Sequence, residues 1–87
     1  MRIDRASWTP PPVFDLVAAV GRVPRADLEA TLNVGVGMVA LVAPDAVDDA
    51  LRTLADRGLP AWVCGEAEAV DPGVGERVVL DGRHPAR

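Results

Sequence analysis

The sequence is poor in aromatic residues, with one Phe, two Trp and no Tyr among 87 residues, although 49% of the residues are hydrophobic. Val, Leu and Ala must therefore form most of the core, and each of them buries less area than an aromatic side chain does. A chain of about this length buries only roughly 60–65% of the surface that its unfolded form exposes. We therefore expect one small domain with a narrow margin of stability, which a partner surface or a missing segment would widen.

Cysteine and histidine each occur once, as Cys64 and His84. A single cysteine excludes an internal disulfide, and one Cys with one His cannot supply the ligands of a structural zinc site. We predict no metal site, an inert core thiol at Cys64 and a solvated tail residue at His84. The lack of disulfides fits a reducing, cytoplasmic location.

Lysine is absent, so all nine basic residues are Arg, and the net charge is −4. No cluster of arginines forms the contiguous positive face that a nucleic acid or an anionic membrane requires. No signal peptide opens the chain, and no apolar run reaches the roughly 20 residues of a membrane-spanning helix. We therefore expect a soluble protein with neither a nucleic-acid nor a membrane partner.

The centre of the sequence changes from helical spacing to an apolar run. Leu28 and Leu32 lie four residues apart, as on one helix face, and the run from Val36 to Ala43 follows after Gly35. The run is β-branched at three positions and interrupted only by Gly37. This pattern predicts a buried central strand over residues 36–43.

The stretch 35–40 reads Gly-Val-Gly-Met-Val-Ala, which matches the dinucleotide fingerprint G-x-G-x-x-A. That fingerprint must follow a strand and open a helix, whereas here the glycines follow a helix and precede a strand, so we reject this interpretation. Two other interpretations of these glycines stay open. The glycines can end the helix and turn the chain, or Asn33, Gly35 and Gly37 can form a polar surface at the mouth of a cleft.

The remaining elements are predicted from spacing and from turn-forming residues. Helices are expected over residues 12–20 and 24–32, together an αα-hairpin, and over 45–57, with Asp45 as a cap and Gly58 as the stop. Residues 61–68 and 77–81 are expected to form a hairpin of two strands.

The elements predict an α+β fold of the half-domain type, an αα-hairpin followed by a β-α-β-β unit. We predict that the chain divides into three parts: an N-terminal arm over residues 1–11 without a core element, the partial domain over 12–81, and a frayed tail over 82–87. No nucleophile motif, P-loop or buried pair of carboxylates is present, and the catalytic residues stay unknown.

Several motifs in order carry a resemblance to a known family. They are Ser7-Trp8, Pro12-Val13-Phe14, Gly21-Arg22-Val23, the stretch Thr31-Leu32-Asn33-Val34-Gly35-Val36-Gly37-Met38, and Gly58, Ala61, Trp62 and Gly65. In this order and spacing the chain resembles the C-terminal end of phosphoribosylformylglycinamidine cyclo-ligases, also called AIR synthetases. Leu32 stands where the family's signature usually has Phe, an apolar exchange at a core position.

The resemblance implies an ATP- and Mg²⁺-dependent step of purine biosynthesis. In it, the formyl oxygen of formylglycinamidine ribonucleotide is activated and a nitrogen closes the ring of aminoimidazole ribonucleotide. Family members are cytoplasmic homodimers, and their ATP-binding N-terminal domain has no counterpart here.

We therefore expect a fragment that is inactive alone and binds neither ATP nor Mg²⁺ by itself. Its expected partner is the missing N-terminal ATP-binding portion, in cis or in trans. An apolar strand face left exposed would also favour self-association into a homo-oligomer. The alternative is a stand-alone binding or regulatory module, in which the segment from Asn33 to Gly37 holds an anion or a partner protein.

Overall fold

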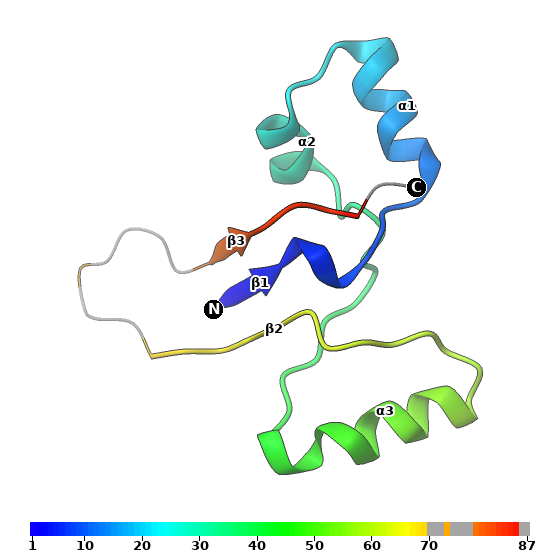
Figure 1. Ribbon diagram of the computed structural model, residues 1–87, viewed down its shortest axis with the longest axis vertical. Helices are drawn as coiled ribbons and strands as arrows, with labels where there is room; N and C mark the ends of the chain where they lie inside the picture. The colour runs from blue at the N-terminus through cyan, green and yellow to red at the C-terminus, as the bar shows by residue number, and fades with distance from the viewer. Residues whose placement is uncertain (70–72, 74–77, 86–87) are drawn as a thin grey trace. The chain divides into compact units, whose positions relative to one another are not determined.

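The computed structural model describes residues 1–69, 73 and 78–85, and its chain divides into two compact units. Unit 1 comprises residues 1–8 and 40–87, and unit 2 comprises residues 9–39. Unit 1 contains the strands and one α-helix, whereas unit 2 contains two α-helices (Figure 1). The combination confirms a small α+β fold.

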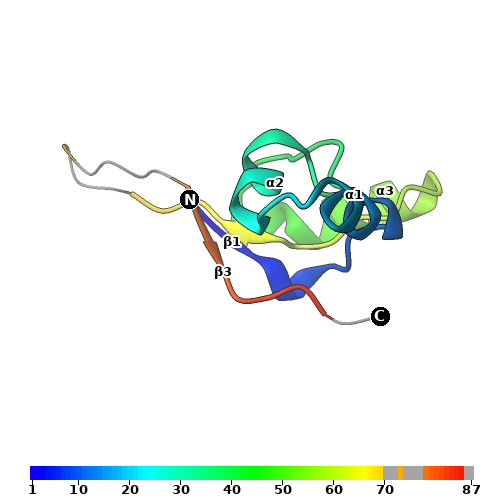
Figure 2. The same cartoon turned by 90° about the horizontal axis from the view of Figure 1, so that it is seen from above.

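Within the described residues, the sheet of unit 1 has three strands in the order β2-β1-β3. The middle strand β1 (Arg2–Asp4) pairs antiparallel with β2 (Gly65–Glu66) and parallel with β3 (Val79–Asp81). Figures 1 and 2 both show β1 alongside β3. The first residues of the chain therefore join two segments that lie more than sixty residues away in the sequence.

Two of our strand predictions are wrong here. The arm over residues 1–11 was expected to lack a core element, yet it holds the middle strand. The segments 61–68 and 77–81 do not form a hairpin with each other, because β1 lies between their strands. Strand pairing satisfies backbone hydrogen bonds with any extended neighbour, so a three-residue strand with little periodicity can still take the central place. Residue 77 lies outside the described residues.

The expected central strand over residues 36–43 is also absent, since none of these residues is in a strand. The segment carries the exposed side chains Met38, Val39, Leu41 and Val42 instead of a buried apolar row. A strand requires a hydrogen-bonded neighbour, and none of the described strands pairs with this segment. The predicted β-α-β-β order therefore does not describe the sheet, whose first strand comes from the N-terminus.

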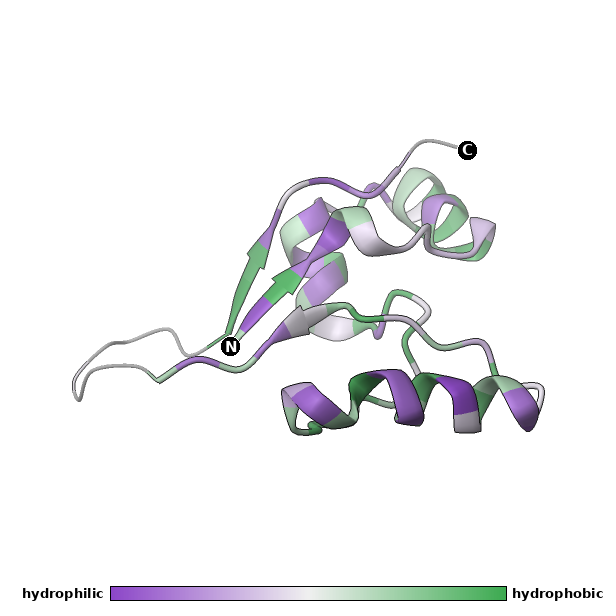
Figure 3. Ribbon diagram, turned by 60° about the horizontal axis from the view of Figure 1, so that its bottom comes forward, coloured by the Kyte–Doolittle hydropathy of each residue, from purple (hydrophilic) through white to green (hydrophobic). Residues whose placement is uncertain are grey.

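Helix α3 (Val47–Asp56) follows a 3-10 turn, η2 (Pro44–Ala46), and matches the predicted helix. Asp45 lies inside the turn and caps nothing, because α3 begins two residues later without a side-chain cap. Gly58 ends the helix as predicted: its φ is +73°, its amide donates to Ala55 O over 2.9 Å, and Leu59 N donates to Leu54 O over 3.0 Å. These two bonds form a Schellman motif. Figure 3 shows polar and apolar residues alternating along α3.

Unit 2 contains α1 (Pro12–Gly21) and α2 (Arg25–Thr31), close to the predicted bounds. Pro12 occupies the first turn, where its missing N–H costs nothing, and Gly21 is the last helical residue. Arg22, with φ +52°, makes the left-handed turn after it. The arrangement of the two helices as an αα-hairpin stays a prediction. Leu28 and Val34, at 1% and 6% exposure, form the buried centre of this unit.

Candidate functional site

The three candidate residues lie in and after a tight turn that follows α2. Asn33 Oδ1 accepts a hydrogen bond from Gly35 N over 3.0 Å, and Asn33 O accepts one from Val36 N over 3.1 Å. Val34 and Gly35 have φ angles of +53° and +97°. Positive φ at both central residues defines a turn of the primed kind, which Asn side chains stabilise by bonding to the backbone two residues on. Asn33 and Gly35 are thus directly joined.

Val34 is the strained member of this turn. A β-branched residue rarely adopts positive φ, because its side chain crowds the backbone there. Val34 is also buried, at 6% exposure. Burial of its side chain in unit 2 therefore offsets the strain, and the turn is fixed from both its polar and its apolar side.

The two glycines have different surroundings. A Cβ added to Gly35 would lie 2.6 Å from Pro11 Cδ and 3.9 Å from Phe14 Cε2, so the backbone packs against the start of α1 where a side chain would not fit. A Cβ added to Gly37 would meet nothing within 4 Å. The turn and the packing against α1 therefore explain why position 35 is a glycine. The space beside Gly37, by contrast, is open to an approaching group.

The polar groups of the turn are largely used within it. The amides of Gly35 and Val36 already donate to Asn33, so neither is free to hold an anion. Asn33, Gly35 and Gly37 are all exposed. The assignment of these three residues to a substrate cleft stays a prediction.

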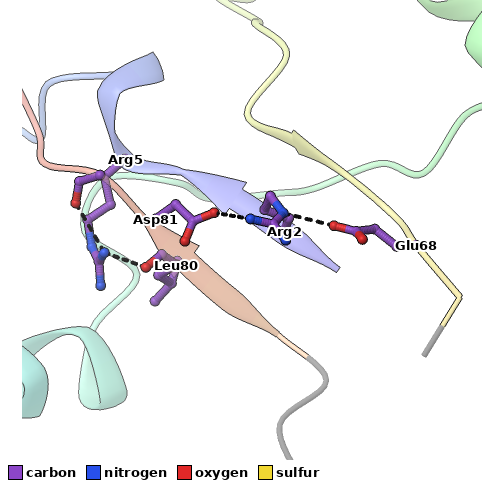
Figure 4. A network of polar contacts seen from close by, with 6 residues as sticks. Arg2, Arg5, Glu68, Leu80 and Asp81 are labelled. Atoms are coloured by element: carbon purple, nitrogen blue, oxygen red, sulfur yellow. Dashed lines mark hydrogen bonds and ion pairs between the residues drawn. The ribbon is translucent and has the colours of Figure 1, made fainter. Parts of the chain in front are cut away.

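A second polar group lies on the sheet of unit 1 and was missed in the sequence. Arg2 Nε lies 2.9 Å from Glu68 Oε1 and Arg2 Nη1 lies 2.7 Å from Asp81 Oδ2, so one guanidinium joins the segments on both sides of β1 (Figure 4). The hydrogen bond to Glu68, followed by that to Asp81, raises the pKa of Arg2 above its usual value. Arg2, Ile3 and Asp4 alternate between polar and apolar, but three residues are too few for this alternation to predict a strand.

An open pocket of about 500 Å³ lies beside this arginine. Its lining residues come from β1, from β2 with the residues before it, and from the end of β3, and they are Arg2, Asp4, Val63, Cys64, Gly65, Glu66 and Asp81. Cys64 is a free, half-buried thiol that lines this pocket. The prediction that it lies in a closed core is therefore wrong. Among residues 1–69, 73 and 78–85, no three His, Cys, Asp or Glu side chains are grouped so that they could hold a metal ion.

His84 was expected to be solvated in a frayed tail, and this is wrong. Its Nδ1 lies 2.9 Å from the carbonyl oxygen of Arg5 and 3.3 Å from that of Trp8. Both oxygens are acceptors, so Nδ1 carries the hydrogen and donates. The ring also meets Trp8 edge-on at a centroid distance of 4.7 Å, and Trp8 lies 6.2 Å from Trp62. Gly82, whose carbonyl oxygen accepts from Arg5, and His84 therefore bind to the N-terminal segment; residues 86 and 87 lie outside the described part.

Comparison with known proteins identifies the family. The family model for "AIR synthase related protein, C-terminal domain" matches residues 1–77. The chain belongs to this family. A protein of Streptomyces fradiae named "Putative phosphoribosylformylglycinamidine cyclo-ligase" is 64% identical over 64 residues, which cover 74% of this chain and 35% of that protein.

Other relatives of the AIR synthase C-terminal domain carry the same name. The phosphoribosylformylglycinamidine cyclo-ligase of Symbiobacterium thermophilum is 45% identical over 76 residues, 87% of this chain and 21% of the relative. That of Cyanothece sp. is 42% identical over 82 residues, 94% of this chain and 22% of the relative. This AIR synthase domain thus spans about a fifth to a third of the length of these curated relatives. No solved structure matches it.

The match places the AIR synthase C-terminal domain of this chain in the C-terminal portion of the longer relatives. β3 and His84 lie after residue 77, where the family model's match ends. In the part of the chain that the structure describes, no helix is long and apolar enough to cross a membrane.

Proposed function

We propose that this chain is the C-terminal part of an ATP-dependent cyclo-ligase that converts formylglycinamidine ribonucleotide to aminoimidazole ribonucleotide in the cytoplasm. The observation that carries the proposal is the family match over residues 1–77, together with relatives that bear this enzyme's name. Since the chain spans only 21% of the Symbiobacterium relative, the rest of the enzyme must supply most of the active site.

The described residues show no preformed site for ATP and Mg²⁺. Among them, no group of three acidic, Cys or His side chains could hold a metal ion without the phosphates of a nucleotide. The guanidinium of Arg2, which could attract phosphates, is already bound to Glu68 and Asp81, and those of Arg25 and Arg52 lie next to Asp15 and Asp49. Because the chain spans only about a fifth to a third of its relatives, we assign the nucleotide and its metal to the rest of the enzyme and expect this chain alone to be inactive.

This chain's contribution is proposed to be a rigid wall of the substrate cleft. The double hydrogen bond of Asn33 and the buried side chain of Val34 hold the turn, and the open space at Gly37 admits the substrate close to the backbone. A fixed wall of this kind would orient the substrate for ring closure, because the wall loses little conformational entropy when the substrate binds. Asn33 is the residue of this wall whose side chain offers polar groups.

A covalent chimera tests the proposal directly. In the Symbiobacterium cyclo-ligase, the segment that this chain matches is replaced by residues 1–87, and formation of ADP and aminoimidazole ribonucleotide is measured. We expect turnover by the chimera and none by the 87-residue chain alone. A folded chimera without turnover contradicts the proposed function. Turnover by the 87-residue chain alone contradicts the proposal that this chain is only a part of the enzyme.

Substitution of Asn33 in the same chimera tests the cleft. Asn33→Ala removes the acceptor for Gly35 N, and we expect kcat to fall about tenfold or more, because misplacement of a positioning wall costs on this scale. The matched control is Asp49→Asn on the exposed face of α3, where its neighbour is Arg52, and it should leave kcat unchanged. Equal kcat values for Asn33→Ala and Asp49→Asn would show that Asn33 does not belong to the substrate cleft.

A further inference from the structure

Unit 1 has secondary structure but no buried side chain among its described residues. The two hydrophobic side chains that are buried among the described residues, Leu28 and Val34, both belong to unit 2. In unit 1, six large apolar side chains outside the sheet are 38–69% exposed, and apart from Val78, next to β3, five of them lie between residues 41 and 63. We call this set the unit 1 apolar surface: Leu41, Val42, Leu59, Trp62 and Val63.

Apart from Leu59, whose N–H donates to Leu54 O, the backbone of this surface is also unpaired. Within the described part of the chain, residues 40–42 and 61–63 make no backbone hydrogen bond. The pairing of β2 with β1 starts only at Cys64, whose carbonyl oxygen accepts from Asp4 N over 2.7 Å. β2 lies at an edge of the sheet, so an extended apolar stretch continues from an edge strand with its donors and acceptors available.

Helix α3 leaves this surface exposed, since each of the surface's five side chains keeps at least 38% of its area accessible. Among the helices and strands, its main contact is the 3-10 turn η2 that precedes it. Its apolar positions are only half-buried, and they are Val47, Ala50, Leu51 and Leu54. A helix with one apolar face normally buries that face against another layer, so unit 1 lacks a layer.

We propose that the unit 1 apolar surface binds the preceding part of the cyclo-ligase polypeptide, which adds an extended segment to residues 40–43 or 61–63 and buries their side chains. This inference rests on the proposed function and names the partner's contact surface. The lengths support this occupant, because the relatives are roughly three to five times as long as the segment that the chain matches. Strand addition would satisfy the unpaired backbone and bury the apolar side chains together.

The test uses two separate polypeptides. The probe is the Symbiobacterium cyclo-ligase with the segment matched by this chain removed, and its affinity for the 87-residue chain is measured by sedimentation. We expect a one-to-one complex, and amide exchange of residues 40–43 and 61–63 should slow on binding. Leu41→Asp should weaken binding at least about tenfold, because an unpaired carboxylate would be buried.

The matched control is Val20→Asp, which places the same charge on an exposed apolar residue of α1 in unit 2. It should change the affinity less than about twofold, since a difference of that size lies within the ordinary effect of a surface substitution. Equal weakening by both variants, or by neither, overturns the proposal.

Exchange of the 87-residue chain alone gives a second reading that does not depend on the probe's folding. Amides of residues 40–43 and 61–63 should exchange freely in the monomeric chain. Strong protection in the monomer, or a dimer that protects these residues, overturns the proposal in favour of a closed unit or a second copy. The chimera's turnover is measured independently, so either hypothesis can fail while the other stands.

Discussion

His84 and Arg5 hold each other's segments in a reciprocal contact. His84 Nδ1 donates to the carbonyl oxygen of Arg5 over 2.9 Å, and the Arg5 guanidinium donates to the carbonyl oxygens of Leu80 and Gly82. Figure 4 shows Arg5 reaching from the end of β1 to Leu80 on β3. Each side chain therefore binds the backbone of the other's segment, which fixes β1 beside β3 at the end of a short strand.

Removal of this imidazole should loosen the sheet. His84→Ala loses a hydrogen bond worth about 0.5–1.5 kcal/mol and an edge-on aromatic contact of similar size. The amide of Val79, which donates to Met1 O over 2.9 Å, should then exchange at least about fivefold faster. Arg83→Ala, at the exposed neighbouring residue, is the control and should leave the exchange rate unchanged.

The turn after α2 should tolerate a methyl group at one glycine but not at the other. Gly35→Ala combines a φ of +97° with a Cβ 2.6 Å from Pro11 Cδ, and we expect it to destabilise unit 2 by about 1–3 kcal/mol. Gly37→Ala has open space and should cost little. Urea unfolding followed by helical circular dichroism compares the two, and equal midpoints would contradict the described turn.

The buried centre of unit 2 should depend on Leu28. This side chain is 1% exposed, and truncation of a buried leucine costs about 2–5 kcal/mol through lost transfer energy and the cavity left behind. Leu28→Ala should therefore lower the thermal midpoint of the helical signal strongly. Leu16→Ala, at a residue 62% exposed on α1, is the matched control with a small expected effect. A larger effect at Leu16 would show that its face is buried instead.

The pairing of β1 with β2 should require glycine at position 65. A Cβ on Gly65 would lie 2.0 Å from the carbonyl oxygen of Arg2, too close for the two strands to keep their register. Gly65→Ala should raise the amide exchange rate of Asp4, which donates to Cys64 O, by about fivefold or more. Gly37→Ala again serves as the control. Unchanged protection of Asp4 would exclude this register.

The sequence by itself determined the helices, because their determinants are local. Proline at the start of α1, apolar residues at helical spacing in α3, and Gly58 with its positive φ are properties of a few adjacent residues. The motif around Asn33 likewise gave the family, which the match over residues 1–77 confirms.

Only the tertiary structure decided the sheet. β1 has three residues and no clear periodicity, and its partners lie more than sixty residues away, so no local pattern could predict its pairing. The run from Val36 to Ala43 has the composition of a buried strand, yet a strand forms only where another backbone satisfies its hydrogen bonds. Composition determined that this segment is apolar, and the absence of a paired neighbour in the described chain left it exposed.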